Sequence, residues 1–349
     1  MGGTMNSRDK QIDVLRGIAL FCMIAANMVP YLLITPHPFI ERFIGSLAAP
    51  LFVTLAGMMA SLSRYKPAHG FKYFLTRGSL LILIGAALDV STYQFFPFTS
   101  MDVLYLIGVS LILSYPLIFV RLSWRIALVL LVFILTPFLQ KTWGYHAIPV
   151  VTTLTLSWQN MANFIQAALQ TWLIEGYFPI FPWFGYFILG TVLGSLRWDN
   201  ATTRYFNHHR FLVFTLLLLI GGASWWFTHP GIIHTRFGYS ELFYPPSLGF
   251  MATSVGMIFI LLYLVDTFPS LRFYWPLALY GKSSMFIYLI HGMLIVYVLG
   301  VLFQPEPVLV YLELYGGLCT AILLMAWILD KMRYRLKKAP FLIRFILGA

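Results

Sequence analysis

Charge is scarce in this sequence. Only 10% of its 349 residues are Asp, Glu, Lys or Arg, whereas 60% are hydrophobic and 17% are aromatic. A soluble domain is about a quarter charged, so no single globular core could bury so many apolar side chains. Lipid must therefore surround most of the chain. The same composition excludes disorder and fibrous repeats.

Cysteine is nearly absent, and the common motifs of soluble enzymes are missing. The two cysteines, Cys22 and Cys319, lie in apolar stretches, so no disulfide framework is available. The chain has no glycine-rich phosphate loop, no G-x-S-x-G elbow, no C-x-x-C pair and no H-E-x-x-H or H-x4-D motif. His208 and His209 stand among basic residues, which favours a solvated loop over a metal site. We expect no metal cofactor.

Ten apolar runs are long enough to cross a bilayer as helices. We therefore predict an all-α membrane protein with about ten transmembrane helices in one bundle, forming a single domain over residues 1–349. The first run carries Asp13 and Arg16 and has no small-x-small cleavage site, so it is predicted to be a span and not a signal peptide. The predicted spans are residues 14–35, 44–63, 73–90, 102–120, 124–140, 178–196, 210–228, 248–267, 276–302 and 308–330.

The basic residues sort between alternate loops. With the N-terminus in the cytoplasm, all 23 Lys and Arg residues except Arg42, Lys141 and Arg236 fall on the cytoplasmic side. This bias predicts that both termini are cytoplasmic, with a basic tail at about 331–349. It also accounts for the net charge of +11 without a nucleic-acid partner.

The predicted outer loops are rich in aromatic residues and proline. This composition fits an interfacial belt or a ledge that holds an outward-facing substrate. The outer segment 141–177 contains Trp158 to Ile174, which is predicted to be an amphipathic helix on the membrane or over a cavity. Gly190 and Gly194 could pack spans within one chain or between the two chains of a homodimer.

The first span carries polar residues at membrane depth, where they are costly. Arg16 and Asn27 are 11 residues apart, so they share one helix face, roughly 16 Å apart along the axis. Asp13 can pair with Arg16 three residues on. One interpretation is an ion pair at the start of the helix plus a packing asparagine. The preferred one, with His37 just beyond the span, is a polar track across the membrane.

Two histidines are candidates for proton transfer. His37 stands between Pro36 and Pro38, where the first span ends, and imidazole can accept a proton from an attacking amine or hydroxyl. His291 shares a helix face with Ser284 and Tyr288 in the ninth predicted span. The alternatives are an exposed loop histidine and a satisfied core histidine, respectively.

Four blocks in order carry a resemblance to a known family. They are Asp13-x-x-Arg16-Gly17 with its run to Asn27, the segment Pro50 to Gly57, the Y-F-P-x-x-P-W-x-G block from Tyr177 to Gly185, and the G-x-x-S-x-x-x-Y-x-x-H segment from Gly281 to His291. Together they resemble the heparan-alpha-glucosaminide N-acetyltransferase family of multi-pass membrane acyltransferases, the third block being similar to its bacterial members.

The resemblance implies an enzyme of the bacterial cytoplasmic (inner) membrane. Such an enzyme takes acetyl from cytosolic acetyl-CoA and passes it to an amino-sugar or sugar hydroxyl, free or in a glycoconjugate, on the outer side. His37 occupies the family's catalytic histidine position and Asn27 its partner asparagine position. Ser46 stands where the family carries an acidic residue. Related O-acyltransferases carry a histidine at the position of Asn27, so the asparagine favours the amino-sugar branch.

The residue chemistry agrees with such a reaction. His37 would deprotonate the acceptor, Asn27 would stabilise the thioester oxygen, and His291 is the third catalytic candidate. Direct transfer is preferred over an acyl-histidine intermediate. A secondary transporter or flippase for an anionic metabolite is the alternative, because it also needs buried His and Arg. A noncatalytic scaffold is a weaker one. The cytoplasmic residues predicted to hold the CoA phosphates are Arg16, Arg64, Lys72, Arg77 and Lys282.

Overall fold

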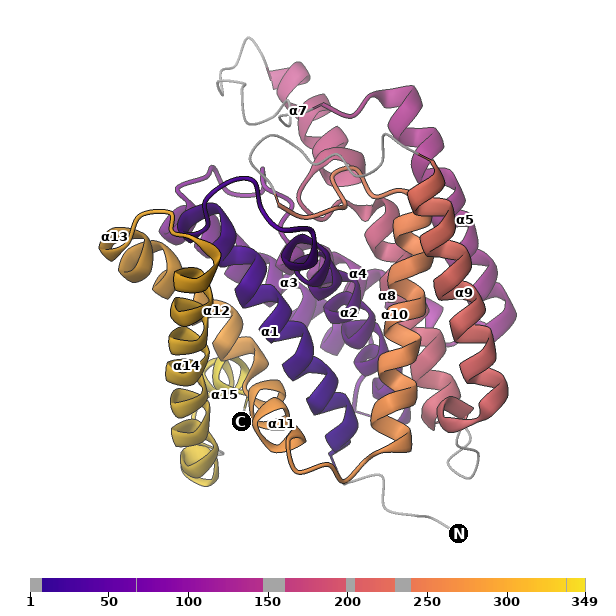
Figure 1. Cartoon of the computed structure of the whole chain (residues 1–349). Coiled ribbons are helices and arrows are strands. Elements are labelled where there is room, and N and C mark those ends of the chain that lie inside the picture. Colours follow the sequence, from indigo (N-terminus) through magenta and orange to yellow (C-terminus); the bar gives the residue numbers. More distant parts are fainter. Residues whose placement is uncertain are drawn as a thin grey trace. The chain divides into compact units, whose positions relative to one another are not determined.

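In the computed structural model the regular elements of the described part are helices, in agreement with the predicted all-α membrane fold (Figure 1). It describes residues 8–66, 68–146, 161–198, 205–229, 240–336 and 338–348. Within these ranges nine helices are long and apolar enough to span a membrane, and α4 (Val103–Leu117) is a shorter apolar helix at the place of the tenth predicted span. The extended backbone in these ranges makes one isolated bridge, Leu33 with Glu306.

The helices form two compact units, which are described separately. The first contains Met1–Leu51 and Phe259–Ala349, and the second contains Phe52–Ile258. The elements of the first unit are α1 (Lys10–Leu32), the start of α2 (Phe39–Leu62), the end of α10 (Leu248–Thr267), α11 (Tyr274–Lys282), α12 (Ser284–Leu294), η6 (Ile295–Leu299), α13 (Gly300–Leu302), α14 (Val308–Leu336) and α15 (Phe341–Leu347).

Helix α1 is the centre of the first unit. Its N-cap is Asp9, whose carboxylate accepts from the backbone N–H groups of Gln11 and Ile12, as such caps do. It packs closely on α11: a Cβ atom at Gly17 would lie 2.6 Å from the Leu277 carbonyl carbon, and one at Gly281 would lie 2.6 Å from that of Asp13. These glycines belong to the first and fourth resemblance blocks, and both are small because two backbones cross there.

The ninth predicted span, 276–302, is interrupted. Helix α11 ends at Lys282, and Ser283 leaves helical geometry with φ −104° and ψ 21° before α12 begins. Two adjacent serines after Lys282 have low helix propensity, whereas the apolar content alone predicted one continuous helix. The structure continues as one candidate span from Ser284 to Leu302.

The second unit is built around α8 (Ile180–Trp198), most of which is buried. Part of the predicted amphipathic segment is observed as α7, while Trp158 lies outside the described residues. The other elements are the rest of α2, η1 (Ser63–Tyr65), α3 (Phe71–Leu88), η2 (Asp89–Tyr93), α4, α5 (Leu122–Trp143), α7 (Met161–Gln170), η4 (Thr171–Glu175), η5 (Tyr205–Asn207), α9 (His209–Thr228) and the start of α10.

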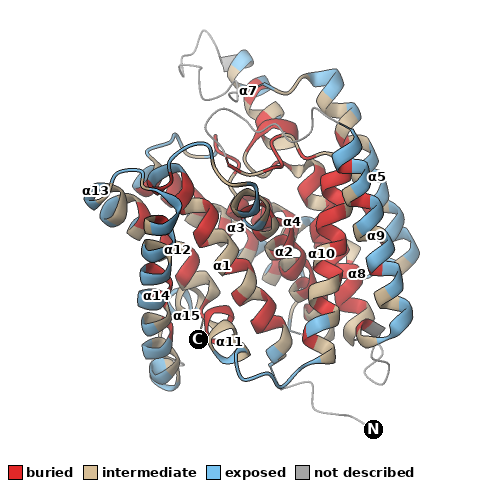
Figure 2. Ribbon diagram, in the orientation of Figure 1, coloured by how far each residue is buried: buried red, intermediate tan, exposed pale blue. Residues whose placement is uncertain are grey.

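Exposed apolar side chains cover α5, α9 and α14, which are largely pale blue in Figure 2. On α9 the exposed residues include Val213, Leu217, Ile220 and Trp225. An apolar surface of this extent needs an apolar solvent, so these faces are suited to contact lipid.

Gly190 and Gly194 pack α8 against α2 within this chain. A Cβ at Gly190 would lie 2.9 Å from the Cα of Gly57, and a Cβ at Gly194 would lie 2.9 Å from the Met58 carbonyl oxygen. Small residues allow this close helix contact. The Gly190-x3-Gly194 pattern is therefore used inside the fold.

We expect Gly57→Ala to destabilise the second unit. The new Cβ would lie 2.9 Å from the Phe187 carbonyl carbon and 3.1 Å from the Cα of Gly190. Overpacking of this kind typically costs about 1–3 kcal/mol, which a thermal melt in detergent measures. Gly221→Ala on α9 is the matched control, because no atom lies within 4 Å of its Cβ position. Equal melting temperatures for the two variants would contradict the close α2–α8 contact.

Candidate active site

Asn27 and His291 form a direct pair between α1 and α12. The Asn27 Nδ2 and His291 Nε2 atoms are 2.8 Å apart, although the residues are 264 positions apart in the chain. His291 is buried, with 1% of its surface exposed, whereas Asn27 is half-buried. Both predicted catalytic candidates in the spans thus belong to one polar pair.

The hydrogen bonds of His291 fix its tautomer. Its Nδ1 lies 3.0 Å from the Ile287 carbonyl oxygen, which can only accept, so Nδ1 carries the ring hydrogen. Nε2 therefore accepts from the Asn27 amide. The lone pair on the Nε2 of His291 is thus taken up by the Asn27 amide. The second Asn27 N–H is not engaged by any residue in the described part of the chain.

His37 lies in the connection between α1 and α2, outside the helices. It is half-buried, and burial lowers the pKa of its imidazole, with the positive charge of Arg42 acting in the same direction. A hydrogen bond with the backbone of Leu33 raises the pKa and only partly offsets these effects. The structure therefore favours a neutral His37 at pH 7, the form that can accept a proton. Of the three catalytic candidates, the fold brings Asn27 and His291 into contact. His37 lies five residues beyond the end of α1.

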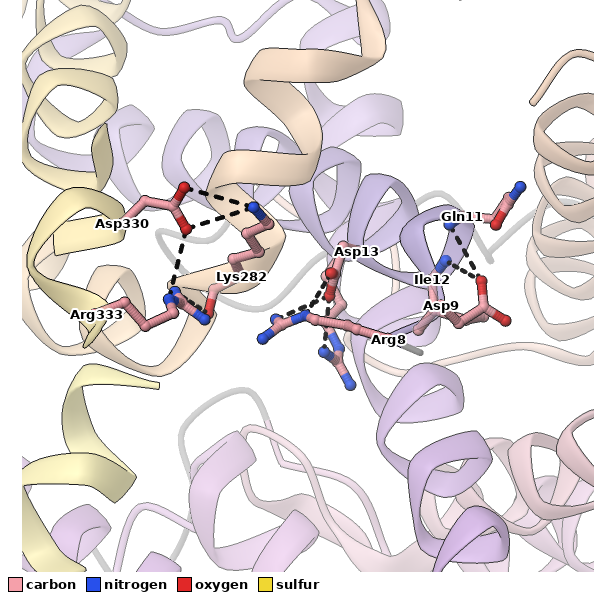
Figure 3. A network of polar contacts seen from close by, with 9 residues as sticks. Arg8, Asp9, Gln11, Ile12, Asp13, Lys282, Asp330 and Arg333 are labelled. Carbon is pink, nitrogen blue, oxygen red and sulfur yellow. Dashed lines mark hydrogen bonds and ion pairs between the residues drawn. The ribbon is translucent and has the colours of Figure 1, made fainter. Parts of the chain in front are cut away.

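Two groups of charges lie at the other end of α1 (Figure 3). In one, the buried Asp13 accepts from Arg8 at 2.5 and 3.0 Å and from Arg16 at 3.3 Å. In the other, Asp330 of α14 pairs with Lys282 at 3.4 Å and with Arg333 at 3.5 Å. Because Gly281 packs on the backbone of Asp13, Lys282 comes to this end of α1.

The structure places Arg16 and Lys282 in this basic cluster of the first unit and adds Arg8 and Arg333, which sequence analysis had not selected. Arg333 also donates to the Lys282 carbonyl oxygen at 3.3 Å. A hint of its role was available, since Asp330 and Arg333 are spaced i,i+3 on a helix. Nothing in the sequence indicated that α14 would meet α11.

The other predicted phosphate ligands, Arg64, Lys72 and Arg77, belong to the second unit. Arg77 donates to the Tyr73 hydroxyl at 3.0 Å, and its guanidinium lies 5.2 Å from the centre of that ring. The His69 ring also stacks on the Tyr73 ring, with 3.7 Å between the two ring centres. Lys72 is exposed and Arg77 is half-buried, so both are accessible from solvent.

Tyrosines of α14 tie down the part of α1 that carries Asn27. Tyr311 donates to the Ala25 carbonyl oxygen at 2.7 Å, and Tyr315 donates to that of Phe21 at 3.1 Å. Their spacing of four residues puts both phenols on one face of α14. These bonds hold the two turns of α1 that precede Asn27 and so help to position its amide.

Two further carboxylates are buried in the second unit, and sequence analysis did not select either. Asp89 accepts from the Tyr105 hydroxyl at 2.6 Å and from the Ser100 hydroxyl at 2.8 Å. Glu175 is fully buried and accepts from the backbone N–H of His146 at 3.0 Å, as well as contacting its ring. Both carboxylates have hydrogen-bond donors, as buried charges require. In the described residues no group of three or more His, Cys, Asp or Glu is placed to hold a metal ion.

These features define a helical multi-pass membrane protein with a polar pair inside a span and a basic cluster at one end of the same helix. A family model described as the catalytic region of heparan-alpha-glucosaminide N-acetyltransferase matches residues 8–230. The match covers well over half of the chain, so the chain belongs to this family. No curated protein matches it at a significant level.

Membership of the family implies acetyltransferase activity with acetyl-CoA as the donor. Asn27 and His37 lie inside the matched region, whereas His291, Lys282 and Arg333 lie beyond its end. The fold extends the matched region by bringing the last helices of the chain onto α1.

Proposed function

We propose that this protein transfers an acetyl group from cytosolic acetyl-CoA to the amino group of an amino sugar on the opposite side of the membrane. The observation that carries the proposal is the Asn27–His291 pair, held on the same helix as the basic cluster formed by Arg8, Arg16, Lys282 and Arg333. The pair and Arg16 are three turns apart along α1, which suits a donor with an anionic head and a long narrow arm. A sugar hydroxyl is the alternative acceptor.

The basic cluster supports binding of the donor's phosphates. Four cations surround two carboxylates, Asp13 and Asp330, so positive charge is in excess. Guanidinium groups hold phosphate oxygens by paired hydrogen bonds. Arg64, Lys72 and Arg77 remain proposed donor ligands in the second unit.

We expect Arg333→Gln to raise the Kd for acetyl-CoA about tenfold or more, because a hydrogen bond to a charged group is typically worth about 1.5–3 kcal/mol. Arg335→Gln is the matched control: it removes the same charge from the same helix, but Arg335 is exposed. Arg16→Gln should resemble Arg333→Gln. Isothermal titration with the purified variants measures the three affinities, and equal affinities for all three would remove the cluster from the donor site.

The proposed chemistry is a direct transfer. The amino nitrogen of the acceptor attacks the thioester carbonyl carbon, and His37 takes the proton that this nitrogen loses. The second N–H of Asn27 stabilises the charge that develops on the carbonyl oxygen. The amide bond forms, the carbon–sulfur bond breaks, and the CoA sulfur leaves as a thiolate that then takes up a proton. His291 acts by holding the Asn27 amide in place.

The orientation is part of the proposal. The distribution of Lys and Arg supports cytoplasmic termini, and the bacterial inner membrane is the proposed location. Sidedness and function are tested together in sealed vesicles of both orientations, with radiolabelled acetyl-CoA outside and a panel of amino sugars or plain sugars inside. Label should enter luminal amino sugars in inside-out vesicles only. Transport of an anion without labelled product in either orientation would favour the transporter alternative.

A further inference from the structure

Arg125 is a buried arginine in the first turn of α5. Only 2% of its surface is exposed. Its Nη1 donates to the Thr191 carbonyl oxygen at 2.8 Å, and its Nη2 donates to the Ser195 hydroxyl at 3.0 Å, both on α8. Its Nε is buried without a partner in the described residues. The guanidinium therefore has two neutral acceptors and keeps its full charge.

No carboxylate in the described part of the chain pairs with Arg125. The charged group that acts on it there is Arg64, which has the same sign. Removing an unpaired ion from water is costly, and a charge inside a membrane protein marks a functional site by default. The positive charge of the Arg125 guanidinium could therefore be neutralised by an anion that is not part of the chain.

Three helix ends of the second unit meet around this charge. Ser61 near the end of α2 lies against Gly194, the residue before Ser195. Arg64 follows Ser61 by three residues, and Arg121 is the N-cap residue of α5. All three arginines were assigned to the cytoplasmic side by the charge distribution, so they form a basic patch at one depth of the membrane.

The residues beside Arg125 face away from the protein. Trp124 is 67% exposed and Ile126 is 43% exposed. In a membrane this face of α5 contacts lipid, and tryptophan is typical of the headgroup level. An anion that reaches this patch from the bilayer has acyl chains along Trp124 and Ile126 and a phosphate beside the arginines.

We propose that Arg125, together with Arg121, binds the phosphate group of an anionic phospholipid at the α2–α5–α8 end. Basic pockets between spans on the cytoplasmic side are suited to such headgroups. This site is separate from the acetyl-transfer chemistry, and its function is to supply the counter-charge for a guanidinium that the protein leaves uncompensated.

The test compares nanodiscs of phosphatidylcholine alone with nanodiscs that also contain phosphatidylglycerol. The wild-type protein should melt at a higher temperature with phosphatidylglycerol and should retain it in native mass spectrometry. Arg125→Gln should lose both effects. Arg210→Gln is the matched control, since Arg210 is an exposed arginine of the same unit at the start of α9, and it should behave as wild type.

If Arg125→Gln does not fold, Arg121→Gln provides the same readout, because Arg121 is exposed and its replacement leaves the bonds of Arg125 to α8 in place. Retention of phosphatidylglycerol by these variants, or equal melting of the wild type in both lipids, would show that Arg125 only anchors α5 to α8. Displacement of the lipid by adenosine 3′,5′-bisphosphate, the nucleotide part of CoA, would reassign the patch to the donor and overturn the proposal.

Discussion

His37→Ala is expected to lower turnover at least ~100-fold, the usual scale for a positioned acid–base group. Acetyl-CoA binding should be unchanged, because His37 lies beyond the end of α1 that is opposite the basic cluster. A radiolabel assay measures turnover and a titration measures binding. His209→Ala is the matched control, because His209 is an exposed histidine at the start of α9.

The pH profile separates catalysis from structure. Burial lowers the pKa of His37, so the base is neutral above a pKa that lies below its ordinary value of about 6.5. The value of kcat/KM should therefore rise with pH through a limb centred below about 6.5 and then level off. This limb should vanish in His37→Ala and persist in His209→Ala. A limb that survives in an active His37→Ala would assign the proton transfer to another group.

Asn27→Ala is expected to cost ~10²–10³ in kcat, the typical scale for removal of an oxyanion donor, with KM for acetyl-CoA nearly unchanged. Asn27→Asp should cost about as much, because it keeps the shape of the side chain but removes the N–H donors. An interaction made only in the transition state lowers kcat without raising KM. The steady-state parameters of the two variants check this.

His291→Ala gives the companion result. If His291 only orients the Asn27 amide through its Nε2, its loss should reduce kcat less than the loss of Asn27 does, and the double variant should be no worse than Asn27→Ala alone. If folded His291→Ala is inactive while His37→Ala is active, the two histidines have exchanged their proposed roles. If both variants are fully active, acetyl transfer does not depend on either histidine, and the proposed assignment of the catalytic residues is wrong.

Much of the architecture could be predicted because it depends on local composition. A run of about twenty apolar residues must form a helix in lipid, since every backbone polar group has to be satisfied within the segment. The fold class, nine of the spans at their predicted places and the Asp13–Arg16 ion pair follow from this rule and from helical periodicity. Sequence periodicity failed at Ser283, where two short helices replace one long one.

The sequence by itself determined the class of protein, the face shared by Arg16 and Asn27, and the four blocks that mark the family. Only the tertiary structure decided that Asn27 meets His291 and that Arg333 joins Lys282 at the start of α1. It also decided that Arg125 is buried with no carboxylate partner among the described residues. The physical reason is range: helix formation and ion pairs at i,i+3 depend on neighbours in the chain, whereas these contacts depend on which helices pack together. Apolar surfaces are alike in composition, so the small residues at helix crossings, such as Gly17 against Leu277 and Gly57 against Gly190, select the partners.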